Sequence, residues 1–457
     1  MIANGLNTYK GSKLQVFQGK LTLAAKSDRR RKFGILYDKV CWWETIEEAW
    51  KKVRDNKGAG GVDGQSIQYI EKEYGVERFL KEVQTELLNK TYRPEKIKRV
   101  WIDKPGKTEK RPLGIPTVKD RVIQQAVKLI IEPILEVDFQ DCSYGFRPNR
   151  NGQQAIEQVS KYLACGCQWV IDMDIKSFFD SIAHQRLITL LEARITDKWI
   201  IRYIRRWLTA GIMDGKEIHY TIAGTPQGGV LSPLLANLYL NELDKTWTAK
   251  GYANRCKQDS HLIRYADDFV VLCPNEETAR TLYKEIESIL AGLELQPNCE
   301  KSRIVYLKEG FDFLGFHFTK GYSQLKQREV VVKFPTKKAT EGIKRTVKAV
   351  LKKTCLGTDI KEVVAKVNVR VQGWANYFII GNSYRQFSEV NKDTTEQLRL
   401  FLRKRYQKKR VRGYQTFPNQ YLYRNLGLVY LPSLFTARAR IRYLPGFTST
   451  RMLPKAC

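Results

Sequence analysis

The chain has 457 residues, 43% of them hydrophobic and 11% aromatic, which is enough apolar material for two or three folded domains and excludes a disordered chain. Its 79 lysines and arginines stand against 48 aspartates and glutamates, and the net charge of +31 predicts a polyanionic partner, nucleic acid before an anionic membrane. It has neither a signal peptide nor an apolar stretch of the ~18 residues that span a bilayer, so we expect a cytoplasmic protein. Nine scattered cysteines and four histidines predict neither a disulfide scaffold nor a zinc site.

Residues 1 to about 30 are polar and weakly patterned, and they end in a basic cluster at residues 29–32 that is either a solvated run or a phosphate contact. A helical pattern over residues 36–57 leads into Gly58-Ala-Gly-Gly-Val-Asp-Gly64, whose four glycines let the backbone approach another molecule closely, a nucleic-acid strand being one possibility. Residues 79–88 predict a further amphipathic helix.

Residues 98–116 predict a strand, a turn at Pro105-Gly106 and a second strand. Lys104 and Arg111 flank the turn, and two cations on a short hairpin can grip a triphosphate. A helix that Thr117 or Asp120 can cap comes next.

A loop at residues 143–150 precedes another helix. We expect its arginines, Arg147 and Arg150, to point out of the turn toward a polyanion.

Residues 169–174 alternate as a strand does, with Asp172 and Asp174 on one side at its end. Two carboxylates there are costly to bury unless they hold a metal. Phe178 and Phe179 follow, and for Phe178 a core position is the better interpretation.

Residues 224–233 form a glycine-rich turn that opens a helix over residues 234–243. Helix starts of this kind favour anions, and Gln227 can hydrogen-bond a base or a phosphate.

The most informative stretch is residues 262–273, where apolar residues run up to Asp267-Asp268 and away from it again. The pattern predicts two strands of a hairpin with acid at the bend. Two like charges held there repel unless a cation sits between them. A lysine could serve, but a divalent metal explains better why the carboxylates are adjacent, and a polar hairpin tip is the plain alternative.

After this hairpin, residues 277–290 predict a helix, and Lys301 stands just before a strand at residues 303–307. Residues 311–318 predict an aromatic hairpin strand, in which Gly315 allows a backbone to lie close.

A boundary at Pro335 opens a largely helical and strongly basic region. Residues 331–420 hold 21 lysines and arginines against 6 acids. Because a solvated helix face would usually mix the two signs, we interpret this region as a nucleic-acid track.

The order of these motifs resembles that of the bacterial group II intron reverse transcriptases, also called maturases. Seven motifs carry the resemblance, and they span about residues 36–430: Gly58–Gly64, Lys104-Pro-Gly106 with Arg111–Pro116, Tyr144–Pro148, Asp172–Asp180, Thr225–Gly229, Tyr265–Asp268 and Phe313–Phe316. The chain ends at Cys457 without a Cys- and His-rich endonuclease region, so we expect the endonuclease-lacking type.

The resemblance implies an α+β fold shaped as a right-hand polymerase with an antiparallel palm sheet. We expect an N-terminal extension over residues 1–90 and fingers and palm over 91–330. A helical thumb, which the family calls its maturase or X domain, would cover residues 331–430, and a short basic tail residues 431–457.

The resemblance also implies roles for single residues. Asp174, Asp267 and Asp268 correspond to the palm carboxylates, which hold two Mg²⁺ ions for phosphoryl transfer. The residues implied in binding the nucleotide are Lys104, Arg111, Phe179 as the gate against a 2′-hydroxyl, Gln227 and Lys301. Those expected beside primer or template are Arg147, Leu314 and Gly315.

The implied function is an RNA-directed DNA polymerase that binds group II intron RNA, assists splicing and retrohomes. Its partners would be the intron RNA, an RNA template with a DNA primer, dNTPs and target DNA. No membrane is expected to be a partner, and the protein would be at the nucleoid when it acts on DNA. Three alternatives stay open: a splicing-only RNA-binding maturase, an RNA-dependent RNA polymerase, and a stand-alone reverse transcriptase that the host uses in defence or DNA repair.

Overall fold

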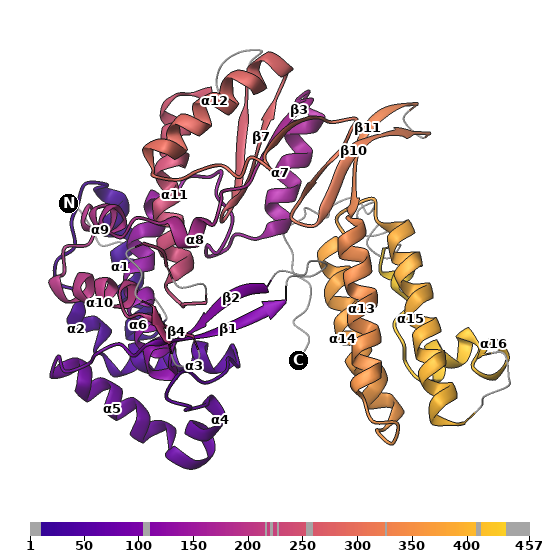
Figure 1. Cartoon of the computed structure of the whole chain (residues 1–457), viewed down its shortest axis with the longest axis horizontal. Helices are drawn as coiled ribbons and strands as arrows, with labels where there is room; N and C mark the ends of the chain where they lie inside the picture. Colours follow the sequence, from indigo (N-terminus) through magenta and orange to yellow (C-terminus); the bar gives the residue numbers. More distant parts are fainter. Residues whose placement is uncertain are drawn as a thin grey trace, which may run out of the picture. The chain divides into compact units, whose positions relative to one another are not determined.

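The structure is a computed structural model, and it describes residues 11–103, 110–214, 217–219, 223–225, 228–252, 259–324, 327–407 and 413–435. These residues mix helices with largely antiparallel sheets, which confirms the predicted α+β class. They form two compact units (Figure 1). Unit 1 holds the described residues up to Ala155 together with Cys167–Ile304, and unit 2 holds Ile156–Gly166 and the described residues from Val305 onward.

Unit 1 contains most of the helices and two four-stranded sheets. Its helices are α1 (Lys13–Ser27), α2 (Tyr37–Val40), α3 (Trp43–Asp55), α4 (Ile67–Tyr69), η1 (Ile70–Tyr74), α5 (Val76–Leu88), α6 (Val118–Leu135), η2 (Glu136–Asp138), α8 (Phe178–Ser181), α9 (His184–Glu192), α10 (Lys198–Leu208), α11 (Ser232–Ala249) and α12 (Glu276–Gly292). Its strands are β1 (Ile97–Asp103), β2 (Lys110–Ile115), β3 (Trp169–Met173), β4 (Ile212–Asp214), β5 (Glu217–His219), β6 (His261–Tyr265) and β7 (Asp268–Cys273). The elements α7 (Gly152–Ala164) and β8 (Arg303–Tyr306) begin in unit 1 and end in residues assigned to unit 2.

The N-terminal helices pack around α6, which contacts both α1 and α3. The helix α6 begins where Thr117 accepts a hydrogen bond from the Asp120 amide at 3.1 Å, so Thr117 is the cap. Asp197 caps α10 and also accepts from the amides of Leu36 and Tyr37, both at 2.9 Å. One buried carboxylate therefore ties the start of α2 to the start of α10.

The first sheet has the strand order β2-β1-β4-β5 and the second has β6-β7-β3-β8. In the second sheet β7 pairs antiparallel with both β6 and β3, and α12 packs against β3 and β7 (Figure 1). Because β7 lies between two strands and under a helix, every residue from Phe269 to Cys273 is buried. The predicted apolar run after the acidic bend is therefore a central strand.

Unit 2 consists of a small sheet and a group of helices. Its elements are β9 (Phe311–Phe313), β10 (Phe316–Ser323), β11 (Arg328–Pro335), α13 (Lys337–Lys353), α14 (Ile360–Phe378), α15 (Tyr384–Arg405), α16 (Gly413–Thr416) and η4 (Tyr421–Asn425). The strands are antiparallel in the order β11-β10-β9, and α13 packs against both α14 and α15. No helix in the parts of the chain that the structure describes is long and apolar enough to cross a membrane.

Candidate active site

The acidic bend at residues 265–268 is a tight hairpin turn, as the sequence predicts. Tyr265 pairs with Asp268 at the ends of β6 and β7, so only Ala266 and Asp267 form the turn. Ala266 has φ +57°, a left-handed conformation that costs a non-glycine residue ~1–2 kcal/mol. Strain of this kind persists where the surrounding structure holds it, and it is frequent at functional sites.

The pairing of β3 with β7 brings the third aspartate to the same place. The last pair of that ladder is Met173 with Phe269. One step further along the same antiparallel register, Asp174 lies opposite Asp268. Two aspartates that are 94 positions apart in the sequence therefore meet at one end of the sheet, beside the turn that carries Asp267.

The electrostatics of this end of the sheet are those of crowded carboxylates. Loss of hydration and repulsion from Asp267, Asp174 and Asp172 raise the pKa of Asp268 to about 6, and Lys301 lowers it. Loss of hydration is the larger cause, and repulsion among the carboxylates adds to it.

Two basic side chains neutralise part of this charge. Lys301 donates to Asp174 Oδ2 at 2.7 Å, and Asn298 donates to the same oxygen at 3.0 Å. Arg303 lies 3.5 Å from Asp172. The predicted position of Lys301 just before a strand is confirmed. Its ammonium lies beside the cluster of aspartates, which attracts cations.

The donor set fits magnesium, which prefers hard oxygen ligands and typically takes one or two carboxylates together with substrate phosphate oxygens. Within the described ranges, no three acidic, histidine or cysteine side chains form a group that could hold a metal ion. A magnesium site at this place would need further oxygens from a bound nucleotide. The negative charge of the crowded aspartates would attract the cation.

The raised pKa of Asp268 predicts how the metal-free protein responds to pH. Because the folded state binds this proton more tightly than the unfolded chain, the stability that it contributes is present at low pH and is lost as the pH rises through about 6. In EDTA, Asp268→Asn should therefore unfold at a higher temperature than the wild type at pH 8, and the difference should be clearly smaller at pH 5, where the folded carboxyl is largely protonated and the unfolded one is not. Thermal unfolding at both pH values checks this, with Asp141→Asn as the control. An equal difference at the two pH values would show that repulsion does not act on Asp268.

A buried ionic network lies directly behind the turn. The Arg264 guanidinium, with none of its side chain exposed, pairs with Asp244 of α11 and donates to Asn237 Oδ1 at 3.1 Å and to the Ala266 carbonyl at 2.9 Å. Burial opposes its charge, but attraction and hydrogen bonding to Asp244, together with smaller contributions from Cys142 and Asp267, raise the pKa of Arg264 overall. These residues were not among those predicted from the sequence. A lone arginine inside the apolar strand was the available signal, because a buried charge requires a partner.

The loop at residues 143–150 corrects one prediction. Arg147 does not point outward: its guanidinium is buried, forms an ion pair with Glu136 at 2.8 Å and donates to the carbonyls of Gln140 and Ser143. The expectation that Arg147 faces a polyanion was wrong, because a bidentate acid on η2 and two carbonyls satisfy it inside the protein. Arg150 bonds to Asp141 instead.

The predicted nucleotide-binding residues are described in part. Lys104 and Gln227 lie outside the described residues, and for Arg111 the structure gives the backbone position in β2, opposite Ile102. Phe179 lies in α8 with its ring 5.3 Å from that of Phe178, which is buried as predicted. The amide of Thr225 donates to the Phe179 carbonyl at 2.7 Å, so the start of the glycine-rich turn lies against the predicted gate.

Leu314 and Gly315 form a tight turn in unit 2, between the paired residues Phe313 and Phe316. Both have positive φ, +48° and +78°, the arrangement of a two-residue hairpin turn with its twist matched to the strands. Tyr377 and Thr336 donate to the two carbonyls of the turn, each at 2.9 Å. The predicted turn is present, and its contact with a primer stays a prediction.

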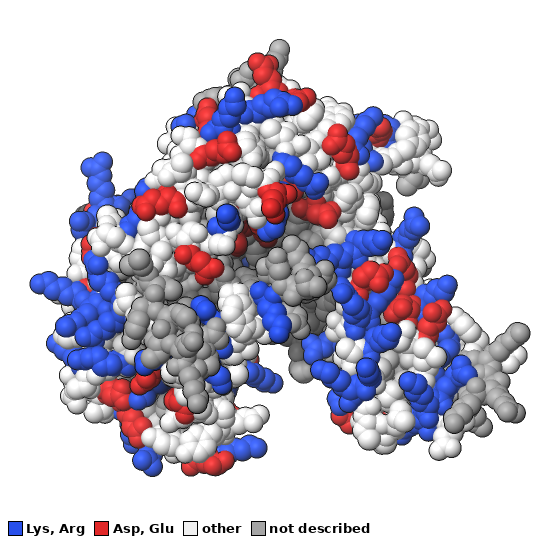
Figure 2. All heavy atoms as spheres, viewed as in Figure 1, with Lys and Arg blue, Asp and Glu red and all other residues white. Residues whose placement is uncertain are grey.

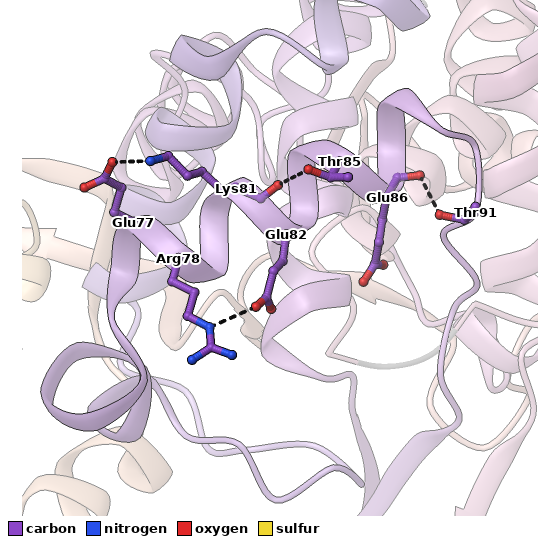
Figure 3. Close-up of a pocket in the computed structure, with 7 residues that line it drawn as sticks. All are labelled: Glu77, Arg78, Lys81, Glu82, Thr85, Glu86 and Thr91. Atoms are coloured by element: carbon purple, nitrogen blue, oxygen red, sulfur yellow. Dashed lines mark hydrogen bonds and ion pairs between the residues drawn. The ribbon is translucent and has the colours of Figure 1, made fainter.

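A hollow on the surface of α5 is lined by seven residues (Figure 3): Glu77, Arg78, Lys81, Glu82, Thr85, Glu86 and Thr91. Its charges pair along the helix, Glu77 with Lys81 at 2.7 Å and Arg78 with Glu82 at 3.2 Å. Since opposite charges one helical turn apart satisfy each other, this hollow resembles an ordinary solvated helix face. None of its lining residues comes from the strands that carry the aspartates.

The helices of unit 2 carry many lysines and arginines (Figure 2). The helix α13 contains seven basic residues and one acidic residue, Glu341. The last turn of α15 adds Arg403, Lys404 and Arg405. An excess of this kind supports the predicted nucleic-acid track.

Two family models match the chain. The one described as reverse transcriptase (RNA-dependent DNA polymerase) matches residues 102–318, which include all three aspartates. The one described as group II intron, maturase-specific domain matches residues 340–417. Together they define an RNA-directed DNA polymerase with a maturase domain.

Protein YkfC of Escherichia coli (strain K12) is 33% identical over 356 residues, which cover 70% of this chain and 92% of YkfC. The group II intron-encoded protein LtrA of Lactococcus lactis subsp. cremoris is 40% identical over 200 residues, which cover 43% of this chain and 32% of LtrA. An uncharacterized 91 kDa protein in the cob intron of Schizosaccharomyces pombe is 37% identical over 204 residues, which cover 43% of this chain and 24% of that protein. The chain belongs to the bacterial group II intron reverse transcriptase and maturase family, and the resemblance of its motifs is confirmed.

Proposed function

We propose that this chain copies RNA into DNA at Asp174, Asp267 and Asp268, and that it binds group II intron RNA to assist splicing and retrohoming. The observation that carries the proposal is the β3–β7 register, which opposes Asp174 to Asp268 beside Asp267. A pKa of about 6 for Asp268 supports it, since crowded carboxylates of this kind are frequent where cations bind.

The three aspartates would hold two magnesium ions, which when bound lower the pKa of the primer 3′-hydroxyl and neutralise charge on the triphosphate. Lys301, which contacts Asp174 at 2.7 Å, would donate to the departing pyrophosphate. Lys104 and Arg111 would grip the triphosphate, and Gln227 would lie beside the incoming nucleotide. Leu314 and Gly315 would hold the primer.

The right-hand arrangement is part of the same proposal. Residues 1–90 would be the N-terminal extension, 91–330 fingers and palm, 331–430 the thumb and maturase domain, and 431–457 a basic tail. Seven basic residues on α13 support a role in holding nucleic acid, with intron RNA, the RNA template with its DNA primer, and target DNA at the nucleoid as the proposed partners.

The deciding experiment extends a DNA primer on an RNA template with magnesium and dNTPs, beside a splicing assay with the RNA that flanks the gene. Extension together with faster splicing supports the proposal. Splicing without extension would favour a splicing-only maturase, and extension without any effect on splicing a stand-alone, host-recruited reverse transcriptase. Failure of both would overturn the proposal.

Phe179 separates DNA synthesis from RNA synthesis. If its ring occupies the space of a ribose 2′-hydroxyl, the wild type should use dNTPs, and Phe179→Val should raise the relative use of rNTPs by at least about tenfold. Single-nucleotide incorporation with each substrate measures the ratio. The matched control is Phe178→Leu, a change in the buried neighbouring ring that should lower stability without changing sugar selectivity. A wild type that uses rNTPs equally well would identify an RNA polymerase.

A further inference from the structure

Phe146 is an exposed aromatic side chain in the midst of buried residues. It exposes 52% of its surface, while Ser143, Tyr144, Gly145 and Arg147 around it are all buried. Its φ is +55°, a left-handed conformation that bulky side chains rarely adopt. The fold therefore places a large apolar ring in solvent and holds it there in an unfavourable backbone conformation.

Several contacts hold this conformation in place. After Phe146, Arg147 is clamped by Glu136 and by two backbone carbonyls. Before it, the Gly145 carbonyl accepts a hydrogen bond from Asn237 at 2.8 Å. Since both neighbours are fixed, the ring of Phe146 has little freedom to fold back onto the protein. Strain that is held so firmly usually serves binding or catalysis.

The same contacts place Phe146 beside the acidic turn. A Cβ on Gly145 would lie only 2.4 Å from the Ala266 nitrogen and 2.9 Å from the Tyr265 carbonyl carbon, so the two backbones touch. The amide of Tyr144 donates to the Arg264 carbonyl, and the amide of Arg264 to the Cys142 carbonyl, both at 2.8 Å. The rings of Phe146 and Tyr265 are 6.1 Å apart. Phe146 and the catalytic aspartates thus belong to one rigid assembly.

We propose that Phe146, together with Tyr265, forms an apolar platform for the base or deoxyribose of the nucleotide at the primer 3′ end. The proposal rests on the proposed function, because a 3′-hydroxyl that reacts at Asp174, Asp267 and Asp268 brings its own nucleotide next to this ring. Aromatic side chains bind nucleotides of any sequence because every base has a π-face. The buried Arg147 is then a positioning residue for the platform, which explains why it points inward.

The experiment measures the affinity of the full chain for an RNA/DNA hybrid with a recessed primer, without dNTPs, beside its thermal stability. Phe146→Asn removes the ring but suits the left-handed backbone, so the unfolding temperature should stay the same or rise. The Kd for the hybrid should increase about fivefold or more, the loss expected for one base–aromatic contact. The slope of log Kd against log salt should not change, because no phosphate contact is removed.

Two further variants sharpen the test. Phe146→Tyr keeps the ring and should restore the affinity of the wild type. Glu294→Gly relieves the same backbone strain at another exposed position, φ +57°, and should leave the Kd unchanged. A Phe146→Asn variant whose Kd stays within about twofold of the wild type, or whose affinity and unfolding temperature fall together, would overturn the platform. If that happens while the wild type still extends primers, the proposed function stands and this inference alone fails.

Discussion

Primer extension by Asp267→Asn is expected to fall by at least about a thousandfold, because the substitution keeps the size of the side chain and removes one of the carboxylates proposed to hold the metal ions. Binding of RNA should change little, since a neutral side chain in an acidic turn repels phosphates less than the aspartate does. Stability should be maintained or should increase, as Asp267 is the carboxylate that contributes most to the repulsion on Asp268. Single-turnover extension, RNA affinity and thermal unfolding measure the three quantities.

Asp180→Asn is the matched control. It makes the same chemical change on α8, at an exposed position outside the trio, and should leave extension within about threefold of the wild type. Extension by Asp267→Asn at a tenth of the wild-type rate or more would contradict the assignment of the catalytic carboxylates. Asp174→Asn should reproduce the loss, because the β3–β7 register places it in the same cluster.

Much of the central hairpin could be predicted from the sequence because its signal is local. Apolar runs on both sides of Asp267-Asp268 indicate the strands and the bend, and β6 and β7 end within a residue of where these runs end. Helix starts were predictable for the same reason: Thr117 accepts from an amide three residues away. Local hydrogen bonds and the alternation of apolar and polar residues depend on the order of neighbouring residues, so they can be predicted from the sequence.

The contacts that complete the site join residues far apart, and local patterns do not contain them. Lys301 bonds to Asp174 across 127 positions, and only the resemblance to a family pointed to this lysine. The predicted outward orientation of Arg147 was wrong for a related reason. An arginine in a loop suggests an outward cation, but its orientation depends on Glu136, which reaches it only after η2 has folded beside the loop. Sequence patterns identify the residue types of a site, whereas the partners that orient them come from tertiary packing.

The second large effect is expected at the buried pair Arg264–Asp244. Both side chains are completely buried, so Arg264→Met leaves the charge of Asp244 without compensation in the core. Breaking a buried ion pair in this way costs ~3–5 kcal/mol, which is a large share of the stability of an ordinary domain. Chemical denaturation of the single variants Arg264→Met and Asp244→Asn measures the loss.

Stability and positioning can be separated at this pair. The double variant Arg264→Met/Asp244→Leu removes both charges and should regain most of the lost stability, because an apolar pair of similar volume often replaces a buried ion pair without penalty. It still lacks the hydrogen bond from Arg264 to the Ala266 carbonyl, which supports the strained turn. Primer extension should therefore remain at least about tenfold below the wild type even where folding has recovered.

The pair Arg194–Asp138 provides the comparison that decides between these roles. It is also largely buried, with 2.9 Å between the charged groups, but Arg194 otherwise donates to the carbonyls of Ala25, Asp28 and Arg31 and does not contact the acidic turn. Arg194→Met/Asp138→Leu should show ordinary extension rates once folded. If the Arg264 double variant also extends primers normally, the network only stabilises the fold. If it folds but extends slowly, Arg264 holds the carbonyl next to Asp267, and the geometry of the turn is set from behind by a side chain that touches neither nucleotide nor metal.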